Sequence, residues 1–202
     1  MADETAKPSG AAELDELVVR AKKDRAAFSR LYECYYPEVS RYCLRRLLVR
    51  SVAEDVISEV FLQVTRSLPL FPGKTNTDFR RWLFRIATNA VNFSLRQSKR
   101  RQDLWLDAAR SGKLNSNDQS SSDSDLCDWP KVYHEIGELD ERDRNIIMLR
   151  FFSNCSYDEI ASVVDASPTA VRTALSRVLS RLREKFKLPA ETDVRLGSDA
   201  AG

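Results

Sequence analysis

The chain has 202 residues, of which 43% are hydrophobic and 31% charged, and its formal net charge is +2. This length suffices for one ordinary domain or two small ones. Glycine and proline are scarce, with six and seven residues, which disfavours a β-rich fold with many tight turns and favours helices. No apolar run approaches the roughly 20 residues of a membrane span, and the polar, acidic N-terminus does not resemble a signal peptide. We therefore expect a cytoplasmic protein without membrane insertion.

The residues that support catalysis or metal binding are few. Cys34, Cys43, Cys127 and Cys155 are scattered without a C-x-x-C pair, and His134 is the single histidine. Such spacing is not that of a zinc site, and thiols in the cytoplasm are usually reduced. The sequence also lacks a glycine-rich phosphate loop. We predict no cofactor, no metal and no catalytic residue, so the protein is not expected to be an enzyme.

Charge and composition divide the chain into two units. Residues 1–106 carry 19 basic and 13 acidic residues, whereas residues 107–128 carry two and five. The second segment is rich in Ser, Asn and Asp and has neither a helical nor a strand period, which is typical of a flexible linker. Within the last third, residues 167–187 hold six basic residues and one acid. A nearly neutral total therefore conceals two basic regions.

The first unit shows three long helical patterns. One covers residues 24–48, where Pro37 either kinks the helix or starts a new one. The second covers 53–68, with apolar residues at three- and four-residue steps. A loop around 72–77 follows, and Asp78 is the expected cap of a third helix over 79–101. This last helix is apolar on two faces, so it is either sandwiched between neighbours or uses some aromatic residues to contact unstacked bases.

The second unit is predicted to contain four short helices, over residues 129–136, 141–152, 157–164 and from 168 onward. Ser156 and Glu159 form a capping box for the third of them. Ser167 is the N-cap of the fourth, and Pro168 occupies its first position. Apolar residues of this last helix, from Val171 to Phe186, recur on one side.

Residues 156–186 have the design of a helix-turn-helix, in which the second helix presents its first turns to the major groove. Polar and basic side chains lie off the apolar stripe, where Arg can read guanine and Ser or Thr can contact bases or phosphates. The alternative is an ordinary helical hairpin with a solvated basic face. The predicted upstream DNA contacts are Ser167, Thr169, Arg172, Thr173, Ser176 and Arg177.

Motifs in both units resemble the sigma-70 family, and specifically its extracytoplasmic function (ECF) group. The second unit resembles region four, with L-D-E-R-D-R-x-I-I-x-L-R followed by S-Y-x-E-I-A. The first resembles region two, through Ala53-Glu54-Asp55-Val56, Phe71-x-Gly73 and Trp82-Leu83-Phe84-Arg85. Ser58 stands where the family usually has Gln, and Pro168-Thr169-Ala170 replaces the usual Gly-Thr. The resemblance implies two small helical domains that bind core RNA polymerase and promoter DNA, both as duplex and as melted single strand. It also implies an anti-sigma protein as a candidate partner.

The resemblance predicts the organisation of the chain. We expect an N-terminal extension at 1–23, a region-two domain at 24–106, a linker at 107–128, a region-four domain at 129–187 and a polar tail at 188–202. The polymerase is expected to contact Asp55, Ser58, Glu59 and Gln63. The loop over 72–77 and Asn89 are expected to hold a flipped base, because an amide offers both a donor and an acceptor. The predicted contacts with melted DNA are Lys74, Asn76, Arg80, Arg81, Arg85, Asn89, Lys99 and Arg100.

Two rival functions remain open at this point. A helix-turn-helix regulator that acts without polymerase would explain residues 156–186 but would leave Asp55 and Glu59 without a role. A helical protein that binds only other proteins is the second rival, and the basic last helix argues against it. Copurification with core polymerase distinguishes the first rival, and a gel shift with core enzyme distinguishes the second.

Overall fold

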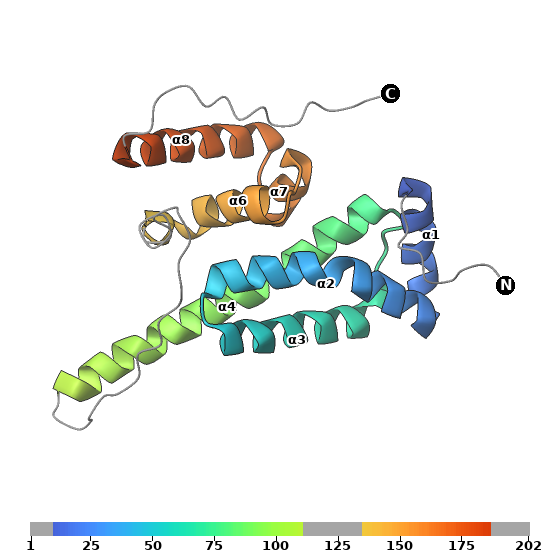
Figure 1. Ribbon diagram of the computed structural model, residues 1–202, viewed down its shortest axis with the longest axis horizontal. Coiled ribbons are helices and arrows are strands. Elements are labelled where there is room, and N and C mark those ends of the chain that lie inside the picture. The colour runs from blue at the N-terminus through green and yellow to red at the C-terminus, as the bar shows by residue number, and fades with distance from the viewer. Residues whose placement is uncertain (1–9, 111–134, 187–202) are drawn as a thin grey trace.

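A computed structural model describes residues 10–110 and 135–186, with side chains described for 10–99 and 135–186. These parts consist of helices and contain no strand, which confirms the predicted all-α class. The N-terminal unit contains α1 (Ala11–Ala21), α2 (Arg25–Leu47), α3 (Arg50–Ser67), the short 3-10 helix η1 (Leu68–Leu70) and α4 (Asn76–Arg110). The C-terminal unit contains α6 (Glu141–Phe152), α7 (Tyr157–Val163) and α8 (Pro168–Phe186) (Figure 1). The predicted tail at 188–202 and the linker from residue 111 onward lie outside the described residues, as do positions 1–9 of the N-terminal extension.

Helix α2 is continuous where the sequence left two alternatives. Its N-cap is Asp24, whose Oδ1 accepts a hydrogen bond from the backbone N of Ala26 at 2.9 Å. Pro37 lies inside the helix on an exposed position, so it neither ends the helix nor starts a new one. The helix stops at Leu48, whose φ of 59° is left-handed and reverses the chain toward α3.

Helix α4 begins earlier than the sequence predicted. The hydroxyl of Thr75 accepts from the backbone N of Asp78 at 3.1 Å, and the carboxylate of Asp78 accepts from the backbone N of Thr75 at 3.4 Å. This reciprocal pair is a capping box with an aspartate at its third position. Asp78 is therefore a helical residue rather than the cap, and the helix starts at Asn76. At its other end α4 continues to Arg110, past the expected boundary at residue 107.

The two apolar faces of α4 are both buried between neighbouring helices. Leu83 on the first face has no exposed surface, and Phe84 and Val91 on the second face are also fully buried. Tyr42 of α2 shares a buried hydrogen bond of 3.0 Å with the hydroxyl of Thr88. The prediction of a sandwiched helix is thus confirmed. Phe93 is the exception, since 58% of it is exposed.

The C-terminal unit is organised by its helix caps. Ser156 and Glu159 form the predicted capping box at the start of α7. The turn to α8 passes through Asp165, whose φ is 50°, and the Ser167 hydroxyl accepts from the backbone N of Ala170 at 3.2 Å. Val171, Leu175 and Val178 are buried, as the apolar stripe predicts. Of the helix expected over 129–136, residues 135 and 136 are described and are helical.

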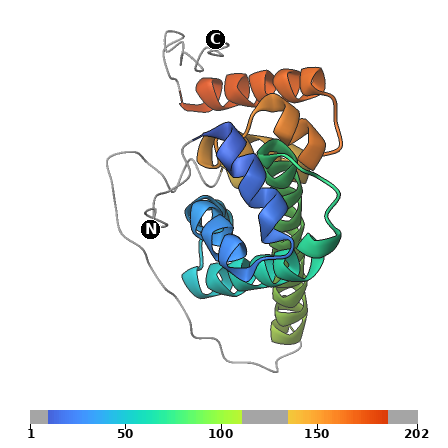
Figure 2. The ribbon, with the colours of Figure 1, turned by 90° about the vertical axis from the view of Figure 1, so that its right-hand side faces the viewer.

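The two units pack against each other, which the sequence did not predict. Helix α6 lies on α2, and α7 lies on the N-terminal half of α4 (Figures 1 and 2). Helix α8 forms the outer layer, on the side of the C-terminal unit that is turned away from α3. This arrangement determines which of the predicted binding residues are accessible.

Candidate DNA and polymerase interfaces

The predicted DNA-reading residues of α8 lie together on its solvent face. Arg172, Thr173, Ser176 and Arg177 are exposed, as are the two N-terminal positions Ser167 and Thr169. The Thr173 hydroxyl donates back to the carbonyl oxygen of Thr169 at 3.0 Å. The guanidinium of Arg172 lies 4.9 Å from the ring centroid of Tyr157 in α7, a cation–π distance that orients the side chain without burying it.

Arg177 differs from its neighbours because it has an ion-pair partner in the same unit. Its Nη2 donates to Oδ2 of Asp143 in α6 at 2.7 Å. The hydrogen bond and charge of Asp143 raise the pKa of Arg177 above its ordinary value. A contact between Arg177 and a base must therefore use the N–H groups that this pair leaves free or replace Asp143, whereas Arg172 is held by its contact with the Tyr157 ring.

A surface groove of about 590 Å³ runs between α3 and α4. Three of the predicted polymerase-binding residues, Asp55, Glu59 and Gln63, line it. The fourth, Ser58, is exposed but donates its hydroxyl hydrogen to the carbonyl oxygen of Glu54 at 2.9 Å. The exposed ring of Phe93 also lines the groove. Acidic groups and an apolar anchor therefore occur in one concave surface.

A second hollow, of about 450 Å³, lies at the loop before α4. Phe71, Gly73, Arg81 and Trp82 contribute to its lining. The rings of Phe71 and Trp82 stack with centroids 4.7 Å apart and an angle of 24°. The Nε of Arg81 is buried and has no hydrogen-bond partner among the described residues. An aromatic wall beside a basic side chain is the kind of surface on which an unstacked base packs.

The structure does not bring Asn89 and the loop over 72–77 together. Asn89 lines the α3–α4 groove beside Asp55 and Glu59. It lies 13 residues after Asn76 in one continuous helix, which separates their backbones by about 20 Å at 1.5 Å per residue. The joint base-binding role predicted for the loop and Asn89 is therefore not supported by their placement.

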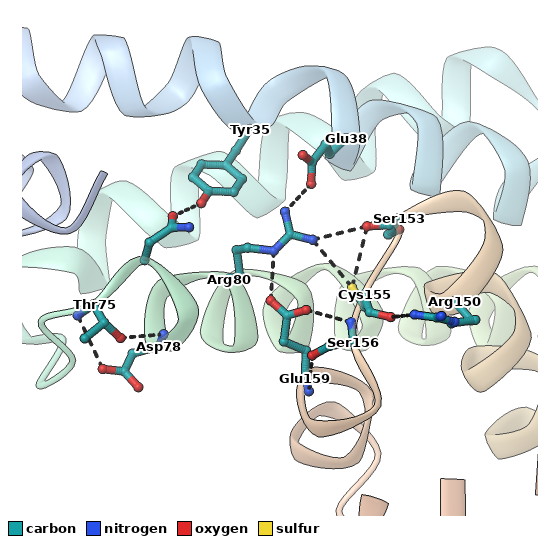
Figure 3. Close-up of polar contacts among 11 residues, drawn as sticks. Tyr35, Glu38, Thr75, Asp78, Arg80, Arg150, Ser153, Cys155, Ser156 and Glu159 are labelled. Atoms are coloured by element: carbon teal, nitrogen blue, oxygen red, sulfur yellow. Dashed lines mark hydrogen bonds and ion pairs between the residues drawn. The ribbon is translucent and has the colours of Figure 1, made fainter. Parts of the chain in front are cut away.

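Arg80, predicted to contact DNA, instead joins the two units. Its Nη1 contacts Oε2 of Glu38 in α2 at 2.5 Å, and its Nε contacts Oε1 of Glu159 in α7 at 2.8 Å (Figure 3). A further bond of 3.2 Å goes to the carbonyl oxygen of Ser153. Burial disfavours the charged guanidinium, and the attraction of Glu38 and Glu159 more than offsets this, so the pKa of Arg80 is raised. We call Arg80, Glu38 and Glu159 the ionic triad.

Other arginines of the N-terminal unit also contact the C-terminal unit. Arg46 is buried and donates to Asn92 of α4 and to Asn145 of α6, at 2.7 Å each. Arg85, another predicted DNA residue, donates to the carbonyl oxygen of Ser162 and to Asp165. In this arrangement Arg80 is held between the units, whereas Arg85 remains exposed and also lines the second hollow.

The remaining predicted DNA residues are dispersed. Lys74 and Lys99 are exposed, and Arg81 is half-buried. Asn76 accepts a hydrogen bond from the Tyr35 hydroxyl. The side chain of Arg100 lies outside the described part. Sequence reasoning missed Glu38, Glu159 and Asn145 as interface residues, because no local signal marks a partner that is distant in the sequence.

The described residues include no group of His, Cys, Asp and Glu side chains that could hold a metal ion. Cys43 and Cys155 are free thiols, and burial raises the pKa of each to about 12. Cys127 and His134 are not among these residues. No helix within 10–110 or 135–186 is long and apolar enough to cross a membrane.

The structure combines a helix-turn-helix unit that has exposed basic side chains with a second helical unit. This combination is typical of helical DNA-binding proteins. Comparison with known proteins identifies the family. Residues 31–101 match the family model described as Sigma-70 region 2, and residues 131–182 match Sigma-70, region 4. The chain belongs to the sigma-70 family, within its group of ECF RNA polymerase sigma factors.

Its relatives carry that name in several bacteria. The chain is 32% identical to the ECF RNA polymerase sigma factor BldN of Streptomyces coelicolor, over 86% of this chain and 66% of that protein. It is 30% identical to the ECF RNA polymerase sigma-E factor of Escherichia coli K12, over 85% of this chain and 93% of that protein.

Two solved structures share the fold. One is CnrH in complex with the cytosolic domain of CnrY, with a TM-score of 0.62, 22% identity and coverage of 86% of this chain and 97% of the other. The second is the sigma factor RpoE with the anti-sigma factor NepR from Bartonella quintana. Here the TM-score is 0.59 with 19% identity, and coverage is 80% of this chain and 97% of the other.

Proposed function

We propose that this RNA polymerase sigma factor divides its work among three surfaces: the α3–α4 groove for core polymerase, the loop hollow for melted DNA and α8 for the upstream promoter element. The observation that carries this proposal is the exposed face of α8, which combines a capped N-terminus with outward Arg172, Thr173 and Ser176. The region-two domain is assigned to 24–106, the linker to 107–128 and the region-four domain to 129–187. The protein acts in the cytoplasm and is not itself an enzyme, and an anti-sigma protein is a further partner.

The α3–α4 groove is the proposed binding site for polymerase because it offers both an exposed aromatic ring and negative charge. The 58% exposed ring of Phe93 provides the aromatic type of contact that commonly dominates binding energy. Asp55 and Glu59 add negative charge at the edge, which favours a basic partner helix and speeds its association. Asn89 lines the same groove, so we now assign it to the polymerase contact.

Charge reversal tests this surface. Asp55→Lys with Glu59→Lys should weaken competition for core polymerase and leave helix content unchanged. The matched control reverses the exposed residues Glu16 and Glu33, which lie outside this groove, and so makes the same change in net charge. Equal competition by the two double variants would remove the groove from the proposal.

The loop hollow is the proposed site for a base of the melted strand. Arg81→Ala should reduce promoter opening, measured by permanganate reactivity, more than it reduces binding to duplex DNA. Asn89→Ala is expected to weaken core binding instead, since it lines the other surface. Loss of opening with Asn89→Ala at normal core affinity would restore the original assignment of Asn89.

The α8 assignment is tested by base preference. A base-reading Arg costs about 1–3 kcal/mol when removed and relaxes specificity at one position, whereas a phosphate-binding Arg weakens all sequences evenly. In a promoter library, Arg172→Ala should change the preferred upstream sequence and Arg183→Ala should not. Arg177→Ala should have a smaller effect than Arg172→Ala, because Arg177 already pairs with Asp143. A shift for Arg183→Ala alone would refute the orientation.

Transcription in vitro tests the proposed function as a whole. Core polymerase supplemented with the chain should start RNA synthesis at defined sites on genomic DNA, and core polymerase alone should not. A chain that binds promoters without supporting initiation would instead be a regulator acting without polymerase.

A further inference from the structure

Helix α1 and the residue after it contact the loop before α4 at two points. The Lys22 Nζ donates to the carbonyl oxygen of Gly73 at 2.6 Å and lies 5.3 Å from the ring centroid of Phe71. Oδ1 of Asp15 accepts from the backbone N of Asn76 at 2.5 Å. Figure 2 shows α1 crossing the end of the helical bundle. This helix precedes residues 31–101, which match the sigma region.

These contacts hold a segment that lacks regular structure. Residues 71–74 belong to no helix, and their carbonyl groups have no helical partners. The backbone N of Asn76 is the first of α4 and has no acceptor within the helix, so Asp15 supplies one together with a favourable negative charge. Lys22 fixes the direction of the Gly73 carbonyl.

The loop is closely packed at Gly73, where neighbouring side chains leave no room for a Cβ atom. A Cβ placed on Gly73 would lie 2.3 Å from Cζ of Phe71 and 2.6 Å from Cβ of Asp78. The Phe71 ring that makes this approach also stacks on Trp82 in the wall of the hollow. A side chain at position 73 would therefore displace the aromatic wall.

The anchoring of α1 does not depend on Asp15 or Lys22. Leu17, Val18 and Ala21 are buried against the bundle, with exposed fractions of 5%, 0% and 6%. Apolar burial of this kind supplies most of the docking energy of an amphipathic helix. The two polar contacts can thus be removed while the helix stays in place.

We propose that Asp15 and Lys22 are positioning residues that set the shape of the loop over 71–76 and so determine base preference in the melted promoter element. The proposal rests on the proposed function of the loop hollow as a binding site for melted DNA. Neither residue needs to touch DNA. Each acts through the loop backbone, so that α1 contributes indirectly to base preference.

The central experiment compares Lys22→Met with Lys23→Met in the full-length chain bound to core polymerase. The two lysines are adjacent, and Lys23 is exposed, so the chemical change is the same at both sites. In a library randomised over the melted element, Lys22→Met should reduce base preference about fivefold, the equivalent of one ordinary hydrogen bond. Lys23→Met should retain the preference. Core affinity and thermal unfolding midpoint should be the same for both.

Conservative replacements separate positioning from bulk stability. Asp15→Asn keeps an acceptor oxygen and should retain most of the preference, whereas Asp15→Ala should lose it. Lys22→Arg keeps a donor and should lie between the wild type and Lys22→Met. If Lys22→Met lowers core affinity or the unfolding midpoint in proportion to the preference, the contact is merely structural and the proposal is wrong.

One further arm distinguishes this proposal from the function on which it rests. If Arg81→Ala shifts base preference and Lys22→Met and Asp15→Ala do not, the positioning role is refuted and the hollow keeps its function. If none of the three variants shifts it, the hollow does not read the melted strand, and both proposals fail.

Discussion

The inside of the N-terminal unit and the interface between the two units are held together differently. Within the N-terminal unit, fully buried side chains such as Leu31, Leu83 and Phe84 fill the space between α2, α3 and α4. Between the units, guanidinium groups carry much of the contact, as Arg46 and Arg80 do. Apolar burial is non-directional, whereas ion pairs depend on geometry and are screened by salt where they are exposed. We therefore expect the inside of the N-terminal unit to be the more stable of the two regions, and the interface to be the first to open.

The largest loss of stability is expected from a change in the apolar core of the N-terminal unit. Leu83→Ala should lower the free energy of unfolding by about 2–5 kcal/mol, because it removes a fully buried side chain and leaves a cavity. Urea titration followed by far-UV circular dichroism measures the change. Leu70→Ala is the matched control, since Leu70 is 88% exposed and surface changes usually stay within about 0.5 kcal/mol. Equal losses for the two variants would contradict the packing described for α4.

The ionic triad should give an intermediate effect of a different kind. Arg80→Met removes charge-assisted hydrogen bonds that contribute about 1.5–3 kcal/mol each when they are made to charged groups. Because these bonds link the units, the expected result is separation with helix content retained. Small-angle X-ray scattering should show a larger radius of gyration for Arg80→Met than for the exposed control Arg41→Met. An unchanged radius would mean that the remaining contacts, such as that of Arg46 with Asn145, hold the units together without Arg80.

The exposed ion pair of the same interface should matter least. Arg85 and Asp165 lie 3.0 Å apart, but their side chains are 46% and 85% exposed. Pairs of this kind contribute about 0–1 kcal/mol and are screened by salt. Asp165→Asn should therefore leave both the unfolding midpoint and the radius of gyration near those of the wild type. An increase in the radius of gyration as large as that of Arg80→Met would show that the interface depends on its exposed ion pairs.

The sequence predicted what short-range chemistry controls. Ser156 and Ser167 occupy the cap positions expected of them, because a cap and the backbone that it satisfies are within three residues of each other. The stripe from Val171 to Val178 also predicted the buried side of α8, and hence its exposed side.

Placement between distant segments was not predictable in this way. The distance of Asn89 from the loop follows from the length of helix between them, but its place beside Asp55 and Glu59 depends on how α3 packs against α4. Arg80 looked like a phosphate contact and lies in the ionic triad instead. The role of Lys22 depends on a carbonyl group 51 residues away. A single sequence carries no periodic or capping signal for contacts of this kind.

Glu159 makes two contacts, one with each unit. These contacts determine whether separation of the units would leave a charge without a partner. Oε1 of this carboxylate contacts Arg80, while Oε2 accepts from the backbone N of Ser156 at 2.7 Å. After separation Glu159 retains its backbone donor, and Arg80 retains Glu38. Neither unit is left with an orphaned charge, which is the usual reason that breaking a buried ion pair is costly. The first helix of the helix-turn-helix would therefore keep its capping residue if this unit left α4.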